Sequence, residues 1–290
     1  MPKLFLRVFY DGSRFYGFQR QPDKETVEGT LLSALREVFS IAIVDPREAQ
    51  YASASRTDRG VHALAQTIAF NIESTSLLEI EEKIGILNNL LHDNGIIVWA
   101  YTLQNAEYHP RHNALYREYL YIERISGCDE EVIDAKKLNR YANLFKGLHD
   151  FKHFSLKDKV ERKTTRQIYD IVVYEENGYI VYKFVARSYT RGLVRIIISC
   201  LKCLSRGTLT IDDVEQAFHD NLTKRLIKAI KPVPSDNLIL YNIAYPFSFK
   251  LLREYWHNII EYFRINSDRP VFDYLYRRFR RSPKEVYMLL

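Results

Sequence analysis

Residues 54 to 63 read Ala54-Ser55-Arg56-Thr57-Asp58-Arg59-Gly60-Val61-His62-Ala63. The glycine after Asp58 predicts a turn, and the alternating apolar residues from 61 to 72 predict a strand that follows it. Arg56 and Arg59 flank Asp58, so they would keep its carboxylate ionised at neutral pH and attract a polyanion. An aspartate held in this way can act as a nucleophile. The alternative is a plain turn in which Asp58 caps its own backbone.

Composition indicates a globular protein that folds without metal or disulfides. The chain has 290 residues, of which 47% are hydrophobic and 27% charged, which suits two domains with a large core. The formal net charge is +6, and Arg and Lys occur in clusters interleaved with Tyr and Phe. This pattern favours nucleic acid over membrane as the partner, although a generally basic surface explains the charge equally well.

Three cysteines do not predict a structural metal site. Cys200 and Cys203 form a single Cys-x-x-Cys pair and Cys128 lies far away, so four zinc ligands are lacking and we expect reduced thiols. A strand pattern begins at Leu4 with no signal sequence before it, and no apolar run reaches membrane-spanning length. We therefore expect a soluble, cytoplasmic protein.

The first half of the chain alternates strand and helix patterns. Thr26 is a suitable N-cap for a helix with apolar residues at helical spacing. The expected elements are a strand over 4–10, a helix over 27–38, strands over about 50–55 and 61–72, a helix over 77–92 and a strand over 96–103. This β-α-β-β-α-β order is typical of the ferredoxin-like fold.

The second half repeats the alternation. Asn177-Gly178 is a strong hairpin signal between two strands, and Gly147 is a candidate C-cap for the helix before it. The expected elements are strands over 114–124, 165–175, 179–187 and 238–244, and helices over 138–145, 196–204, 212–218 and 249–265. The sequence thus predicts an α+β protein with two ferredoxin-like halves, 1–105 and 106–247, whose sheets meet around a central basic cleft, and a basic, aromatic helical extension, 248–290.

The strand over 114–124 carries a cation and two aromatic rings on one side. Period-2 geometry places Arg117, Tyr119 and Tyr121 on the same face. Such a face could stack on a nucleic-acid base, or it could belong to a strand with half-buried tyrosines.

Four separated segments resemble motifs of one family, the tRNA pseudouridine synthase A family. They are the Arg56 to Ala63 stretch, the loop from Tyr10 to Gln21, the pattern formed by His109, Arg111, Arg117, Tyr119 and Tyr121, and the stretch from Phe184 to Arg195. They follow the family order and span Leu4 to Tyr245. Phe18 replaces the usual Trp, and Tyr189, Thr190, Gly192 and Leu193 also depart from the family pattern.

The resemblance implies an enzyme that converts uridine to pseudouridine in tRNA, at anticodon-arm positions 38 to 40, as a homodimer without metal or cofactor. It implies that Asp58 is catalytic, that Tyr119 stacks on the target base and that Arg195 pairs with Asp58. Further substrate-binding positions are Arg56, Arg111 and Leu193.

Two alternatives remain open at this point. The chain could modify other tRNA positions or another RNA, or it could be a non-catalytic RNA-binding protein on the same sheets, because fold alone does not carry function. Asp58, Tyr119 and Arg195 meeting in a cleft would favour the enzyme. The extension could bind RNA or support a dimer, or it could pack on the core with a solvated basic face.

Overall fold

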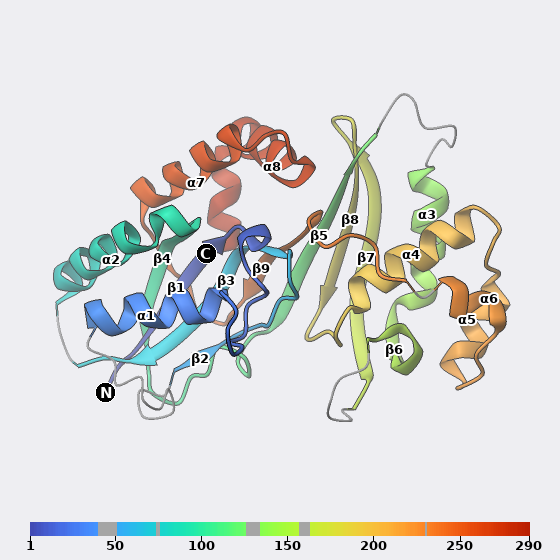
Figure 1. Ribbon diagram of the computed structural model, residues 1–290, viewed down its shortest axis with the longest axis horizontal. Coiled ribbons are helices and arrows are strands. Elements are labelled where there is room, and N and C mark those ends of the chain that lie inside the picture. The colour runs from blue at the N-terminus through green and yellow to red at the C-terminus, as the bar shows by residue number, and fades with distance from the viewer. Residues whose placement is uncertain (40–50, 74–75, 126–133, 157–162, 230) are drawn as a thin grey trace. The chain divides into compact units, whose positions relative to one another are not determined.

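A computed structural model describes residues 1–39, 51–73, 76–125, 134–156, 163–229 and 231–290 (Figure 1). These residues form two compact units: unit 1 comprises 1–115 and 239–290, and unit 2 comprises 116–238. Both combine strands and helices, which confirms the predicted α+β class. Among the helices of the described residues, none has the length and apolar character needed to cross a bilayer. The predicted division after residues 105 and 247 stays a prediction.

Unit 1 is a mixed sheet with helices packed against it. Its strands lie in the order β10-β4-β1-β3-β9, with β2 paired to β3. The β3–β9 pair is parallel and the other pairs are antiparallel. The elements are β1 Lys3–Tyr10, η1 Gly12–Arg14, α1 Val27–Phe39, β2 Ala52–Ser53, β3 His62–Asn71, α2 Leu77–Leu91, η2 His92–Asn94, β4 Ile96–Gln104, β9 Leu238–Ala244, β10 Lys250–Leu251, α7 Arg253–Ile265, α8 Pro270–Arg281 and η5 Pro283–Leu289.

Strand β1 is buried along its whole length, so both of its faces are covered. The C-terminal segment supplies part of that cover. The ring centroids of Phe9 and Phe263 lie 5.5 Å apart, and the Arg7 guanidinium lies 4.4 Å from the Phe249 ring. Buried Arg7 also donates a 2.9 Å hydrogen bond to the Ile243 carbonyl. The extension therefore completes the core of unit 1.

Unit 2 has an antiparallel sheet in the order β5-β8-β7-β6. Asn177 and Gly178 have φ of 54° and 83° and join β7 to β8, as a two-residue hairpin requires. The predicted hairpin is confirmed. The elements are β5 Tyr116–Arg124, α3 Ala135–Ala142, η3 Asn143–Phe145, β6 Gly147–Asp150, η4 Lys152–Phe154, β7 Thr165–Glu176, β8 Tyr179–Ala186, α4 Leu193–Ser205, α5 Ile211–Phe218 and α6 Lys224–Ala229.

Several expectations differ from the structure in detail. Gly147 does not cap a helix: α3 ends at Ala142, a 3₁₀ turn follows, and Gly147, with φ of 99°, begins the unpredicted strand β6. The strand expected over about 50–55 consists of the two residues of β2, and residue 50 lies outside the described residues. So does Cys128. Cys200 is buried and in no disulfide, and burial, with a smaller effect from Cys203, raises its pKa to about 12.

Candidate active site

The stretch from Ala54 to Val61, called the Asp58 turn below, connects β2 to β3. The Val61 amide donates to the Asp58 carbonyl at 3.2 Å, and Gly60 has φ of 82°, a conformation that favours glycine. The Thr57 side chain is buried and its Oγ1 lies 2.7 Å from the Tyr10 hydroxyl. Asp58 is half-buried, whereas its neighbours Arg56 and Arg59 are exposed. The turn thus presents a carboxylate between two exposed cations on a fixed backbone.

A second segment, residues 11–18 between β1 and α1, packs on this turn and is called the Asp11 loop. The Phe18 amide donates to the Thr57 carbonyl at 3.1 Å. Gly17 has φ of 101°, and a Cβ at this position would lie 3.2 Å from the Thr57 carbonyl oxygen and 3.3 Å from the Arg59 amide nitrogen. Only glycine fits here without displacing the residues on either side of Asp58.

The Asp11 loop also carries an exposed aromatic ring between two cations. The Arg59 guanidinium lies 4.5 Å and the Lys24 ammonium 4.7 Å from the centroid of the Tyr16 ring. Tyr16 is 41% exposed, whereas Phe15 and Phe18 are buried. This group, called the Tyr16 patch, includes Arg59, the residue that follows Asp58 in the sequence, and combines positive charge with a stacking surface. Both suit a nucleic-acid strand.

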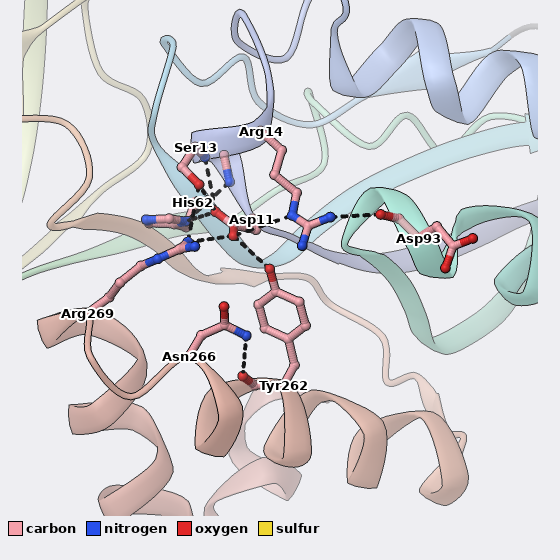
Figure 2. Close-up of polar contacts among 9 residues, drawn as sticks. Asp11, Ser13, Arg14, His62, Asp93, Tyr262, Asn266 and Arg269 are labelled. Carbon is pink, nitrogen blue, oxygen red and sulfur yellow. Dashed lines mark hydrogen bonds and ion pairs between the residues drawn. The ribbon is translucent and has the colours of Figure 1, made fainter.

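The first residue of the loop is held by a polar cluster (Figure 2). Asp11 is fully buried, and its carboxylate accepts hydrogen bonds from the Tyr262 hydroxyl at 2.7 Å and Arg269 Nη1 at 2.5 Å. It also accepts from the Ser13 amide at 3.0 Å and lies 3.1 Å from His62 Nδ1. Burial alone would raise the pKa of Asp11, but the interactions with His62, Tyr262 and Ser13 outweigh it and hold the pKa well below its usual range.

Sequence reasoning missed this cluster. It indicated only a loop from Tyr10 to Gln21, in which Asp11 caps the 3₁₀ turn η1. Its partners Tyr262 and Arg269, however, lie 251 and 258 residues away along the chain. No local pattern connects these positions.

Arg111 is exposed on a tight turn of unit 1. The Asn113 side chain accepts from the His109 amide at 2.8 Å, and the His109 ring accepts from the Arg111 amide at 3.1 Å. The Tyr245 hydroxyl donates to the Pro110 carbonyl at 2.6 Å. Burial, with neighbouring cations, lowers the pKa of His109. The Arg111 side chain is therefore presented from a well-anchored backbone.

Tyr119 lies on β5 of unit 2, where it is 7% exposed. Its ring meets the Tyr189 ring edge to face, with centroids 5.1 Å apart and an interplanar angle of 86°. The Tyr189 hydroxyl donates to the Arg117 carbonyl at 3.2 Å, and the Arg117 side chain donates to the Arg187 carbonyl. The loop after β8 therefore fixes the orientation of the Tyr119 ring.

Helix α4 carries the other two predicted residues of unit 2. It begins after Gly192, whose φ is 73° and where a Cβ would lie 2.7 Å from Cγ of Leu156. Leu193 is 1% exposed and packs into the core. Arg195 is half-buried and donates through Nη1 to the Val233 carbonyl at 3.1 Å. The Val233 amide in turn donates to the Arg195 carbonyl at 3.3 Å.

The six predicted site residues thus divide between the units. Unit 1 carries Arg56, Asp58 and Arg111, and unit 2 carries Tyr119, Leu193 and Arg195. Their roles stay predictions. Within the stretches that the structure describes, no group of three or more His, Cys, Asp or Glu side chains is arranged to hold a metal ion.

The known proteins that resemble this chain carry one family name. A family model described as tRNA pseudouridine synthase matches residues 141–246. A protein named tRNA pseudouridine synthase A from Thermococcus sibiricus is 38% identical over 246 residues, 84% of this chain and 85% of that protein. Proteins of the same name from Methanothermobacter thermautotrophicus and Pyrococcus furiosus are 34% and 30% identical, over 87% and 91% of this chain and 84% and 94% of theirs.

A solved structure titled "Crystal Structure of a Cbf5-Nop10-Gar1 Complex" aligns with 78% of this chain and 60% of that chain, at 14% identity and a TM-score of 0.34. That likeness is too weak to indicate a shared fold.

Proposed function

Since this chain belongs to the tRNA pseudouridine synthase A family of RNA-modifying isomerases, we propose that it isomerises uridine to pseudouridine in the anticodon stem-loop of tRNA, at positions 38 to 40, with Asp58 as the nucleophile. The observation that carries the proposal is the Asp58 turn. It presents a half-buried carboxylate between exposed Arg56 and Arg59, next to the Tyr16 patch. A carboxylate that must meet a polyanion needs such positive surroundings.

The chemistry assigns a task to each predicted residue. The target uridine leaves its stack, and the Tyr119 ring supports the base. The Asp58 carboxylate attacks the nucleoside and the bond between C1′ and N1 breaks. The base rejoins C1′ through C5, the bond to Asp58 breaks so that the carboxylate is regenerated, and N1 takes up a proton. The hydrogen at C5 leaves as a proton, so no oxidant, reductant or energy source is consumed. Arg195 stabilises the carboxylate charge.

Binding of tRNA rests on the exposed cations. Arg56, Arg59, Arg111 and Lys24 are exposed in unit 1, and contacts of this kind with phosphates supply most of the affinity of RNA-binding proteins. Leu193 is buried and can line the base pocket only through apolar contact. The affinity for tRNA should therefore fall steeply as salt is added.

Both units are proposed to be diverged copies of the ferredoxin-like plan, their sheets lining a central basic cleft. Unit 1 has the order β4-β1-β3-β2, with antiparallel neighbours, and β5-β8-β7 of unit 2 repeats the β1-β3-β2 part of it. We also propose a homodimer in the cytoplasm that binds tRNA across both subunits, as the family resemblance implies. Light scattering that finds only monomer in an active preparation would contradict the dimer.

The decisive experiment measures tritium release from tRNA labelled at C5 of uridine. Asp58→Asn is isosteric and should retain the fold and tRNA binding, but release should stop because a neutral amide is not a nucleophile of this kind. The matched control is Asp170→Asn, which removes a charge paired with Lys146 at 2.7 Å on β7 and should release tritium as the wild type does. Comparable release by Asp58→Asn and wild type would remove Asp58 from its role.

Two further outcomes separate the alternative functions. Tritium release with pseudouridine mapped outside positions 38 to 40 would identify a synthase for other uridines. Tight binding with no release by the wild type would identify a non-catalytic RNA-binding protein.

A further inference from the structure

We propose that the end of α7 and the residue before α8 position the Asp58 turn: Tyr262 and Arg269 hold Asp11, and Asp11 fixes the Asp11 loop against that turn. This inference rests on the proposed role of Asp58. It assigns a positioning function to the C-terminal extension, which lies outside the motifs that resemble the family.

The anchor, formed by Tyr262 and Arg269, joins two helices to one buried carboxylate. Tyr262 comes from the last turn of α7 and Arg269 immediately precedes α8, and both donate to the same carboxylate oxygen of Asp11 (Figure 2). Phe272 of α8 packs on the cluster: its ring centroid lies 5.7 Å from that of Tyr262 and 4.8 Å from that of His62. Charge-assisted hydrogen bonds to a fully buried carboxylate are among the strong polar contacts of a protein interior.

The Asp11 loop transmits this anchor to both sides of Asp58. At its start, a Cβ on Gly12 would lie 2.0 Å from the Val61 carbonyl oxygen, so the Gly12 backbone rests directly on the residue where β3 is about to begin. At its end, the Phe18 amide binds the Thr57 carbonyl and Gly17 rests on Thr57 and Arg59. The loop therefore contacts the turn before and after the carboxylate.

A nucleophile needs this support because its rate depends on sub-ångström placement. A misplacement of about 1 Å can lower a rate by about a hundredfold. Tyr262 and Arg269 act on Asp11, and the Asp11 loop in turn lies against the backbone on both sides of Asp58. Loss of the anchor should slow the chemical step and leave most tRNA contacts intact.

The experiment compares variants of the anchor with matched variants on the same helices. Tyr262→Phe and Arg269→Gln each remove one donor to Asp11. The control for Tyr262→Phe is Tyr255→Phe, which removes a hydroxyl from the same helix at a side chain that interacts with Asn88 of α2. The control for Arg269→Gln is Arg277→Gln, which removes an ion pair with Asp273 at 2.9 Å within α8. For all four variants, kcat and KM are measured by tritium release. Backbone hydrogen exchange is measured by mass spectrometry on peptides that cover residues 56–62.

We expect Tyr262→Phe and Arg269→Gln to lower kcat about tenfold, the usual effect of losing one hydrogen bond to a charged group. The change in KM should stay within about twofold. Exchange in peptides covering 56–62 should accelerate, and Arg269→Lys, which keeps the charge, should recover part of kcat. Tyr255→Phe and Arg277→Gln should match the wild type in all three measurements.

The inference is overturned if the anchor variants leave exchange over 56–62 at the wild-type rate, or if kcat falls equally in the controls. It is also overturned if exchange accelerates while kcat stays unchanged in an enzyme whose Asp58→Asn variant is inactive. If Asp58→Asn itself retains turnover, the proposed catalytic role has failed, and the exchange data still show whether the anchor fixes the turn.

Discussion

Replacing Gly17 by alanine tests how closely the reaction depends on the backbone around Asp58. Gly17 has φ of 101°, and the added methyl carbon would lie 3.2 Å from the Thr57 carbonyl oxygen and 3.3 Å from the Arg59 amide nitrogen. These are backbone atoms of the turn and cannot rotate away as a flexible side chain would. The turn must move by a few tenths of an ångström or the loop must lift from it.

The size of the expected losses in stability and turnover follows from comparison with Gly178 in the β7–β8 hairpin. Gly178 has φ of 83°, and a Cβ there meets nothing within 4 Å, so Gly178→Ala carries backbone strain alone, about 1–2 kcal/mol. Gly17→Ala carries about 1–3 kcal/mol of strain and the contact with the turn in addition. For units of this size, each kcal/mol lowers Tm by about 2–4 °C. Only Gly17→Ala should also lower turnover, by about tenfold or more, because it alone displaces Asp58.

Thermal unfolding followed by circular dichroism and tritium release from labelled tRNA measure the two effects on the same preparations. We expect both variants to lose stability and Gly17→Ala alone to lose activity at a temperature where both are folded. Full turnover by Gly17→Ala, or an equal loss in Gly178→Ala, would refute the reasoning that the loop fixes the turn.

Tyr119→Ala should lower turnover strongly while the affinity for tRNA falls little, since stacking on one base contributes about 1–3 kcal/mol. Filter binding and a turnover assay on the same variant check this. Lost binding with intact turnover per bound tRNA would contradict it. Arg195→Lys should lower both activity and Tm, because lysine cannot both reproduce the hydrogen bond to the Val233 carbonyl and present a planar guanidinium. Asp11→Asn should change acid stability: the pKa of Asp11 is lowered in the folded state, so the unfolded chain takes up the proton first and wild-type stability falls as the pH drops below about 4. In urea unfolding the variant should be less stable near neutral pH and lose less stability below about pH 4. If the free energy of unfolding of variant and wild type fell equally below that pH, the lowered pKa of Asp11 would be contradicted.

Local signals in the sequence predict the structure correctly where one residue type controls the backbone. Asn177-Gly178 predicted the hairpin because both residues adopt positive φ, and Thr26 predicted the start of α1, whose Gly29 amide it caps at 3.3 Å. The position of Asp58 in a turn before a strand followed from Gly60 and the alternation after it. These features depend on contacts within a few residues.

Features that depend on distant partners could not be predicted in this way. Strand β6 is four residues long and is stabilised by pairing with β7, so its own composition carries little signal. The role of Asp11 depends on Tyr262 and Arg269, whose distance along the chain hides the cluster from any periodicity. The sequence around Gly147 predicts a helix cap, whereas its positive φ serves the start of β6.

The long separation along the chain between β1 and the helices that cover it also has a consequence for synthesis of the protein. The ribosome completes β1 and the Asp11 loop long before it reaches Tyr262, 251 residues later, and domains can fold while translation continues. During that interval one face of β1 lacks its aromatic cover and the Asp11 carboxylate lacks two of its donors. A nascent chain interrupted before Tyr262 lacks both of these donors, so if Asp58 has the proposed role, such truncated translation products should remain inert toward tRNA even though they contain all six predicted site residues.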